Sequence, residues 1–472
     1  MTTHRRTVHF GAIRDGSSLG GLAWRQLAVL VLAGLWALVG TRIIGGTFGG
    51  ILGIAGAGVL GAGALMRPAG RLPIDWLAIG VGYLTARIRG AHRHAHTPTH
   101  SQLVAPAHLG ATCIIAVPSA SGEIGLILDQ RRLIAVLVLS PNQWMLSSHS
   151  DADAARARWG AILTRCAQPG SAITRLQWTA TSHGLGAVAR SRYIDPARAT
   201  DRESVARYLS VVDATAQTAR AYAITLAIAI DCPRRGGVDT HATTLIDAAR
   251  TLRGDIRAAG LGDATLATPT DLATQLRIAH DPTQRDGATD SPHAPAPVTP
   301  TPDGWAPMAH EASWGSVRCD GSWHTVFWIS QWPRGEVDPD ILAPLVIDGT
   351  SDRTVSVVMA PQDPTRARRD AERQRTQTDA DDDLRARTGF IGSIRRTRQR
   401  DAISTHEREL ADGHAGYRFT GYVAVSAASE ESLAVAAEDV THSAHKAQCE
   451  LRRLWGEQLA GLAATLPLCR GI

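Results

Sequence analysis

A chain of 472 residues can bury several hydrophobic cores, and a formal net charge of only +5, with both signs interspersed, does not by itself indicate a nucleic-acid partner. The six cysteines are scattered without any Cys-x-x-Cys spacing, which argues against a zinc site or a disulfide framework. Composition therefore favours a chain of two or three folded domains with reduced thiols.

The first strong element is the apolar stretch Leu27–Met66, which Arg42 divides into two runs. A helix that spans a bilayer needs about 20 mostly apolar residues. The second run, Ile43–Met66, reaches that length, and the first, Leu27–Thr41, reaches it when flanking residues sit at the interfaces. We therefore predict a transmembrane helical hairpin over residues 23–67. A signal peptide is disfavoured because a second apolar run follows at once, and a pair of buried helices is the alternative.

Arginines flank both ends of this stretch, in a basic arm at residues 1–22 and again after Met66. The positive-inside rule then predicts a multi-pass protein of the plasma membrane with both termini and most of the chain in the cytoplasm. The second run is rich in glycine, and small residues about four apart let helices approach closely in lipid. The candidate positions for this packing are Gly46, Gly49, Gly50, Gly53 and Gly56.

Residues 68–104 are predicted to form a juxtamembrane segment. Asp75–Arg89 is apolar with basic residues at its end, which fits an interfacial helix and fits a helix that caps a domain nearly as well. Four histidines follow before residue 101 without a neighbouring thiolate or carboxylate, so we interpret this part as a solvated linker and not as a metal site.

Residues 105–280 are predicted to form a first cytoplasmic α+β domain. Short apolar runs separated by turn residues predict an antiparallel meander at Thr112–Val117, Ile124–Leu128 and Leu133–Leu139. Further strands are predicted at Ile173–Trp178 and Ala221–Ile230, and helices at Asp151–Cys166, Asp201–Arg220 and Thr240–Ala259. This alternation predicts a layered domain with helices packed on a sheet.

Residues 281–304 are rich in proline and are predicted to be a linker, because such a stretch cannot build a core. A second α+β domain follows over residues 305–472. Its predicted strands are Trp323–Ile329, Arg353–Met359, Tyr417–Val425 and Cys449–Trp455, and its predicted helices are Thr365–Arg387 and Ser393–Asp412, which form a charged helical hairpin, and Ser429–Ala447. The order of elements resembles the ferredoxin-like motif, so the two domains are candidates for two such repeats.

The stretch Trp314–Arg334 concentrates tryptophan around a hairpin turn at Asp320-Gly321. Its strand alternation favours a sheet that is covered on both faces. Exposed aromatic side chains would instead mark a partner interface. The candidate signature or interface residues here and later in the chain are Trp314, Trp323, Trp328, Trp332, Arg334, Arg353 and Trp455.

The sequence carries no strong catalytic signal. The only lysine, Lys446, is not part of a phosphate-binding loop, and the acidic cluster Asp379–Asp383 lies in a run of mixed charge that reads as a solvated helix face. We therefore predict no catalytic residue, no cofactor, no metal site and no direct binding of nucleic acid.

Several phrases resemble an actinobacterial family of two-span integral membrane proteins: the tryptophan-rich stretch, Arg175–Trp178, Arg353–Arg369, Cys449–Gly471 and the N-terminal Arg6–Gly11. Members of this family are associated with PrgI-like membrane subunits and TraC/TrbE-type ATPases in loci resembling type IV (conjugative) secretion systems. The chain also looks like a PrgI-like hairpin fused to the N-terminal, non-ATPase domain of the secretion ATPase.

The resemblance implies a non-enzymatic membrane scaffold that docks a separate ATPase and PrgI-like subunits, and hence a hetero-oligomer. Two alternatives stay open. One is a type VII secretion component of the EccE kind, and the other is an enzyme at the inner leaflet, which would need a concave polar pocket with perturbed titratable groups.

Overall fold

The computed structural model describes residues 17–19, 22–44, 46–66, 71–95, 109–120, 122–141, 149–184, 219–232, 237–286, 304–333, 337–338, 340–387, 407–410 and 413–471, and the single residues 203, 207, 208, 210, 211, 214, 215, 302, 404 and 405. The chain divides into two compact units. The first takes in Arg89–Ala367 and Gly413–Ile472, and the second takes in His9–Ile88 and Arg368–Asp412.

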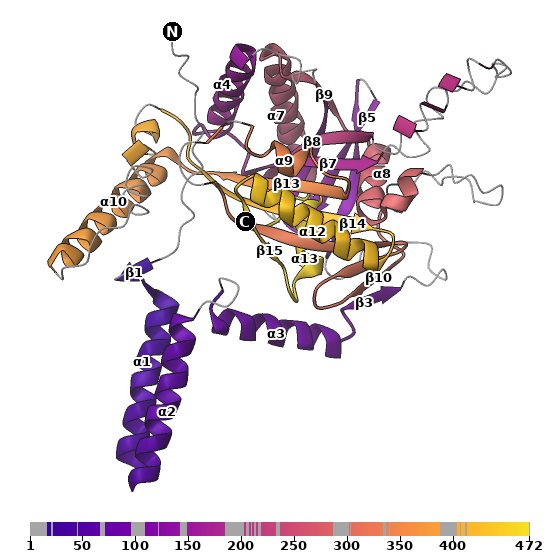
Figure 1. Ribbon diagram of the computed structural model, residues 1–472. Coiled ribbons are helices and arrows are strands. Elements are labelled where there is room, and N and C mark those ends of the chain that lie inside the picture. Colours follow the sequence, from indigo (N-terminus) through magenta and orange to yellow (C-terminus); the bar gives the residue numbers. More distant parts are fainter. Residues whose placement is uncertain are drawn as a thin grey trace. The chain divides into compact units, whose positions relative to one another are not determined.

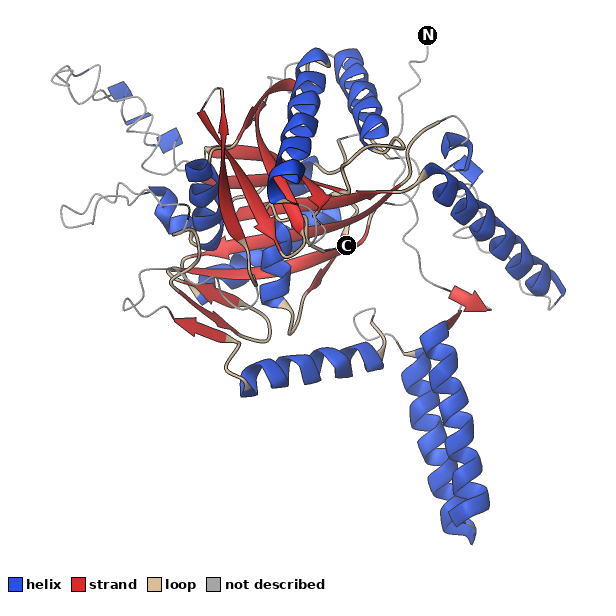
Figure 2. Cartoon of the chain, turned by 180° about the vertical axis from the view of Figure 1, so that it is seen from behind, coloured by secondary structure: helices blue, strands red, loops and turns tan. Residues whose placement is uncertain are grey.

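The first unit is built on one antiparallel sheet of 13 strands (Figures 1 and 2). The main order across the sheet is β3-β10-β11-β12-β14-β13-β7-β8-β6-β5-β4, and β15 also pairs with β12 and β9 with β6. The strands are β3 (Arg93–Ala95), β4 (Cys113–Ser119), β5 (Gly122–Asp129), β6 (Arg132–Pro141), β7 (Arg175–Gly184), β8 (Arg220–Asp231), β9 (Gly262–Leu266), β10 (Ala309–Ala312), β11 (Val317–Cys319), β12 (Ser322–Gln331), β13 (Asp352–Pro361), β14 (Tyr417–Ala427) and β15 (Glu450–Arg453).

Helices lie on both faces of this sheet (Figure 2). They are α4 (His149–Cys166), α7 (Val238–Ala258), α8 (Pro269–His280), the 3-10 helix η4 (Pro282–Asp286), α9 (Ala343–Val346), α12 (Glu430–Lys446) and α13 (Gln458–Thr465); α10 (Pro364–Arg387) begins in the first unit and continues in the second.

The sheet contains two topological repeats. The first repeat is β6-α4-β7-β8-α7-β9 and the second repeat is β12-α9-β13-β14-α12-β15, which in both cases is the β-α-β-β-α-β succession of the ferredoxin-like motif. In each repeat the first strand pairs with the third strand on one edge. Its other edge is shared between the last strand of the repeat and the preceding hairpin partner, β5 or β11. The sheet therefore contains the same arrangement twice.

Backbone hydrogen bonds fix which residues of the two repeats correspond. At the end of β9, Ala267 N donates to Val136 O at 2.9 Å, and at the end of β15, Leu454 N donates to Val326 O at 3.0 Å. In each repeat, this bond joins the first strand to the residue that directly follows the last strand. Val136 thus corresponds to Val326, and Ala267 to Leu454.

The strand registers carry this correspondence to the junction between the repeats. In the first repeat Val136 of β6 pairs with a residue of β8, which in turn pairs with Gln177 of β7. In the second repeat Val326 of β12 pairs with a residue of β14, which in turn pairs with Thr354 of β13. Gln177 and Thr354 therefore correspond. Thr179 and Ser356 are each two residues further along and therefore also correspond. Because Thr179 and Ser356 pair with each other where β7 meets β13, a local two-fold axis passes through this pair.

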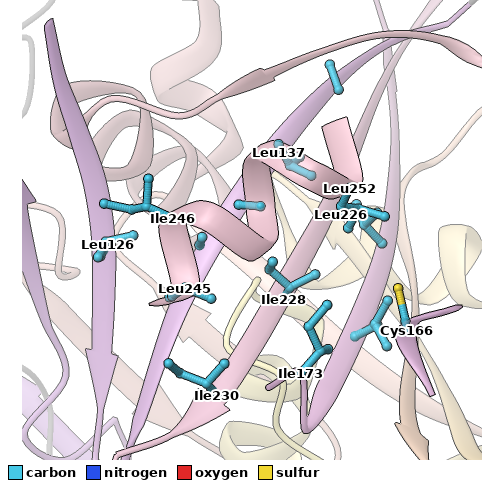
Figure 3. Close-up of a cluster of buried hydrophobic side chains, with 14 of the residues drawn as sticks. Leu126, Leu137, Cys166, Ile173, Leu226, Ile228, Ile230, Leu245, Ile246 and Leu252 are labelled. Atoms are coloured by element: carbon cyan, nitrogen blue, oxygen red, sulfur yellow. The ribbon is translucent and has the colours of Figure 1, made fainter. Parts of the chain in front are cut away.

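Two cores lie on opposite faces of the first repeat. On one face, α4 and α7 pack on the sheet through large aliphatic side chains (Figure 3), among them Leu126, Leu137, Leu226, Ile228, Leu245, Ile246 and Leu252. On the other face, α8 and the segment after α13 cover the alternate residues of the same strands, among them Ile127, Ile134, Val136, Leu272, Leu466 and Leu468. In the second repeat α13 covers the face that bears Val326.

The segment after α13 is fixed by buried polar groups at the junction. Gln177 is fully buried, and its Nε2 donates to Leu466 O at 2.7 Å while its Oε1 accepts from Cys469 N at 2.6 Å. The next residue, Arg470, forms an ion pair with the buried carboxylate of Asp129, with Nε donating to Oδ2 at 2.9 Å. Residues near the end of the chain thus complete the core of the first repeat.

The second unit contains a helical hairpin of α1 (Trp24–Val39), a π-helical turn η1 (Gly40–Ile44) and α2 (Gly46–Leu65). It also contains α3 (Pro73–Ile88) and the short paired strands β1 (Ser17–Leu19) and β2 (Leu22–Ala23).

The predicted transmembrane hairpin over residues 23–67 is wrong, because no helix in the described part of the chain combines the length and apolar character required to cross a bilayer. Helix α1 has only 16 residues, and glycine, which has no side chain to bury in lipid, recurs throughout the 20 residues of α2. The predicted fold class is corrected to a large antiparallel sheet with helices. The predicted multi-pass location in the plasma membrane is contradicted by the same finding.

Most of the predicted strands and helices are present in the sheet unit. The meander is β4-β5-β6, and the predicted strand Ala221–Ile230 and helix Thr240–Ala259 are β8 and α7. Of the predicted linker, residues 287–301 lie outside the described residues, as do large parts of the predicted helices Asp201–Arg220 and Ser393–Asp412. Strands from both sides of the linker belong to one sheet.

Candidate interaction groove

A groove runs between α12 and the edge of the sheet formed by β12 and β15. Its volume is about 530 Å³, and it is lined by Phe327, Ala434, Ala437, Glu438, Thr441, His442, His445, Arg453 and Trp455. Six of these residues come from α12. We call this site the α12 groove.

The sequence of α12 explains why these side chains line the groove. Ser429 caps the helix and forms a reciprocal capping box with Ser432, with Ser432 N donating to Ser429 Oγ at 3.2 Å. An apolar face packs on the sheet, through residues that include Leu433, Ala436, Val440 and Ala444. The residues at helical spacing beside this face then border the groove, so that Glu438, Thr441, His442 and His445 lie along its wall.

Arg453 is the central polar residue of the groove. Its guanidinium carbon lies 5.0 Å from the centre of the Trp455 ring and 5.7 Å from that of Phe327, within the range of cation–π contacts. Its Nε donates to Thr325 Oγ1 at 2.8 Å, and Thr325 Oγ1 in turn donates to Gly315 O at 3.0 Å. Burial lowers the pKa of Arg453 from its usual range. The side chain therefore contacts two aromatic rings and is oriented by one hydrogen bond.

The structure brings the tryptophan-rich stretch and the C-terminal stretch together beside this groove. Gly456 N donates to Trp314 O at 2.7 Å, and a Cβ atom at Gly315 would lie only 2.5 Å from the Trp455 ring. Trp314 and Trp455 were both predicted as signature or interface residues, and their segments are direct neighbours. Of the two, Trp455 lines the groove.

The other predicted aromatic residues lie elsewhere on the second repeat. Trp323 is partly buried beneath the Arg318 guanidinium, and Trp328 donates from Nε1 to Thr420 Oγ1 at 3.1 Å. Trp332 is buried and meets Phe419 edge to face at 5.3 Å. None of these three lines the groove. Arg334 lies outside the described residues.

Arg353 is buried under α12 and does not line the groove. It is 2 % exposed, and its Nη1 donates to Ser443 Oγ at 3.3 Å. Burial lowers its pKa, and the carboxylate of Asp439 acts in the opposite direction. A Cβ atom at Gly349 would lie 2.9 Å from Arg353 Nη2, so the glycine makes room for the guanidinium. Arg353 thus links strand β13 to the buried face of α12 through its hydrogen bond to Ser443.

The predicted packing glycines lie on α2. A Cβ atom at Gly53 would lie 3.1 Å from Ala37 O, and one at Gly56 would lie 2.1 Å from Trp36 Nε1, so both lie at the contact with α1. Gly46 and Gly50 have open space around the Cβ position. The surroundings of Gly49 lie outside what the structure describes.

The strongly shifted histidines lie in the interior. His280 and His324 are fully buried, and burial lowers the pKa of each to about 4. Nε2 of His324 bonds to His280 O at 2.8 Å and therefore carries a proton, while Nδ1 lies 2.9 Å from Ser426 Oγ. Within the residues that the structure describes, no three His, Cys, Asp or Glu side chains are grouped so that they could hold a metal ion.

Sequence reasoning missed Arg453, Phe327, His442 and His445 as a group. The tryptophan-rich stretch Trp314–Arg334 includes Phe327, but its pattern gave no reason to set Arg453 beside it. The signal that finds this pair is the register, in which Phe327 lies opposite Arg453.

Comparison with known proteins gives one family match. Residues 218–329, about a quarter of the chain, match the family described as "Putative type VII ESX secretion system translocon, EccE". The matched segment runs from β8 of the first repeat into β12 of the second, and it includes Thr325 and Phe327 at the groove. No curated protein matches the chain. The match supports the coarser prediction, a component of a secretion system.

Proposed function

We propose that this chain is a non-enzymatic scaffold subunit of a type VII-like secretion machine, where it would bind other subunits of the translocon. The observation that carries the proposal is the match of residues 218–329 to the EccE family. The matched segment runs from β8 of the first repeat into β12 of the second, so the similarity includes strands of both repeats.

The character of the described sites supports a scaffold in preference to an enzyme. Enzyme sites gather perturbed titratable groups in a concave pocket. Here the strongly perturbed groups, such as His280 and His324, are fully buried. The α12 groove has two aromatic walls and an arginine, which are residue types enriched at protein interfaces.

The test is a pull-down of the tagged chain from its own host in mild detergent, followed by mass spectrometry. The tag belongs at the N-terminus, because Cys469 is buried close to the other end. An unrelated protein with the same tag and the same abundance is the control. Enrichment of FtsK-like ATPase subunits of a type VII system supports the proposal.

Two results would contradict it. Recovery of a TraC-like ATPase with a PrgI-like subunit would favour the type IV (conjugative) assignment, which rests on the resemblance of sequence phrases. A monomer that brings no partner at all, while the purified chain remains folded, would contradict the scaffold role itself.

A further inference from the structure

One equivalent position holds an apolar residue in the first repeat and a charged residue in the second. Since Ala267 corresponds to Leu454, the preceding residues Leu266 and Arg453 also correspond. In the first repeat Leu266 packs against the core beneath α7. In the second repeat the arginine stands at this position and lines the α12 groove.

The residues next to this position on the first strand of each repeat also differ between the repeats. The counterparts of Phe327 and Thr325 on the first strand are Leu137 and Ala135, and both are fully buried in the α7 core. The second repeat thus has an aromatic ring and a hydroxyl group where the first repeat has buried aliphatic side chains. A charged group at a position that the fold can fill with leucine is costly to desolvate, so arginine is not the stabilising choice there.

The Arg453 guanidinium also has unused donors. Thr325 accepts from Nε, and among the described residues no acceptor contacts the two terminal nitrogen atoms and no carboxylate forms an ion pair with this side chain. The two rings and Thr325 fix the orientation of the planar group. A fork of N–H donors held in this way is suited to bidentate recognition of a planar anion.

The charge of the groove selects the kind of anion. Among the lining residues Arg453 is the one with a permanent positive charge, and Glu438 contributes a negative charge nearby. A phosphate group carries close to two negative charges and would meet repulsion from Glu438. A carboxylate carries one, so Glu438 repels it about half as strongly, and a single guanidinium balances its charge. The apolar part of the lining, which includes Ala434, Ala437 and Phe327, suits the aliphatic neighbours of such a carboxylate in a peptide.

We propose that the α12 groove binds an acidic peptide segment of a partner protein, with a carboxylate of the peptide paired to Arg453 and its apolar neighbours packed between Trp455 and α12. This proposal goes beyond the scaffold function, because the groove would recognise such a peptide whichever machine the chain belongs to.

The test is a fluorescence-anisotropy titration of the full chain with labelled peptides. The probes are a panel of capped heptapeptides with a central Glu and with Ala, Leu, Phe or Ser at the flanking positions, each labelled with an uncharged fluorophore. Every peptide has a counterpart with Gln at the centre. At least one Glu peptide is expected to bind ten times more tightly than its Gln counterpart, and acetate is expected to compete better than inorganic phosphate at the same concentration.

The variants separate binding from folding. Arg453→Gln is expected to reduce the preference for Glu over Gln to less than twofold. Arg453→Leu, which installs the residue of the first repeat, is expected to lose the same preference with no fall in the thermal midpoint. The matched control is Arg452→Gln in the same strand, whose guanidinium pairs with Glu450 at 3.0 Å, and this variant is expected to keep the preference.

Three results would overturn the proposal. One is that no peptide of the panel distinguishes Glu from Gln, and another is that inorganic phosphate displaces the peptide more effectively than acetate. The third is a fall of more than about 5 °C in the thermal midpoint of Arg453→Leu, which would show that the arginine holds the fold together.

Discussion

Thr179 faces Ser356 across the pair β7–β13, and the same two residues are each other's counterparts in the two repeats. Pairing between equivalent strands at a two-fold axis joins two sheets edge to edge. It also removes the open edge that each repeat would otherwise present at β7 or β13, where unpaired backbone groups favour aggregation. The 13 strands therefore form one sheet with no seam between the repeats.

A buried amide contributes to the junction. Replacement of Gln177 by Leu would leave the backbone amide of Cys469 without its acceptor, and it would remove one of two donors from each of the carbonyl groups of Ala464 and Leu466. Buried groups without hydrogen bonds are costly, so we expect a loss of about 3 kcal/mol in the free energy of unfolding, measured by chemical denaturation. Thr181→Val in the same strand, which removes a partly buried contact to Thr354, is the control and should cost less than about 1 kcal/mol. Equal losses in the two variants would contradict this role.

Three buried histidines make stability depend on pH. The pKa values of His280, His310 and His324 lie at about 4 in the folded chain, against about 6.5 in the unfolded chain, because burial disfavours the charged form. The unfolded chain therefore binds protons first as the pH falls. Stability is fully present above pH 6.5 and is lost between pH 6.5 and 4, by up to roughly 3 kcal/mol for each histidine.

Denaturation curves between pH 4 and 7.5 check this dependence. His324→Gln is expected to lower stability at pH 7 but to make the decline toward pH 4 shallower than in the wild type. Thr181→Val, which changes a group that does not titrate in this range, should leave the slope unchanged. An identical slope in the wild type and in His324→Gln would contradict the assignment.

The hairpin of α1 and α2 is expected to be sensitive to side-chain size at one glycine and tolerant at another. Gly53→Leu would place a side chain against Ala37 O and Gly40 Cα, both backbone atoms that cannot move aside, so the helices must separate. Gly50→Leu points into open space. Hydrogen exchange followed by mass spectrometry should show faster exchange in residues 24–65 of the first variant only. Faster exchange in both would show that the close approach at Gly53 is not what holds the hairpin.

The cysteines are expected to differ sharply in reactivity. Cys113 is exposed, whereas the other five are buried, and burial raises the pKa of Cys449 and of Cys469 to about 12. A thiol reagent at pH 8 should label one cysteine rapidly in the native chain, because the thiolate is the reactive form. Cys113→Ser should abolish the rapid phase. A rapid phase that survives this substitution would show that a buried site opens.

The sequence was sufficient for the local elements but not for their assembly. Helix α7 and strand β8 follow from apolar periodicity and clear end signals, and the bounds of both lie within two residues of the predicted ones. The pairing of β7 with β13 does not follow from local pattern, because it joins residues about 180 positions apart. A proline-rich stretch between the two repeats favoured separate domains, yet strands on either side share one sheet.

The residues of the α12 groove also could not be predicted from local sequence pattern. In the stretch Glu450–Arg453 the pattern offers two consecutive arginines, and nothing local tells which of them lies between aromatic rings. Only the register against β12 sets Arg453 opposite Phe327. The membrane prediction failed for another reason. The apolar runs on either side of Arg42 do form two helices, but α1 has only 16 residues and α2 is rich in glycine, so neither combines the length and apolar character that a bilayer requires.

The position of the segment after α13 has a consequence for biosynthesis. Cys469 reaches Gln177 across 292 positions in the sequence, and Leu466 and Leu468 fill the core of the first repeat. While the ribosome is still adding residues, α8 covers only part of this face of the nascent first repeat, and the part where Leu466 and Leu468 pack stays open. Contacts of such long range form late and slowly. Newly made chains would therefore expose apolar surface until residues 464–470 emerge from the exit tunnel and complete the core.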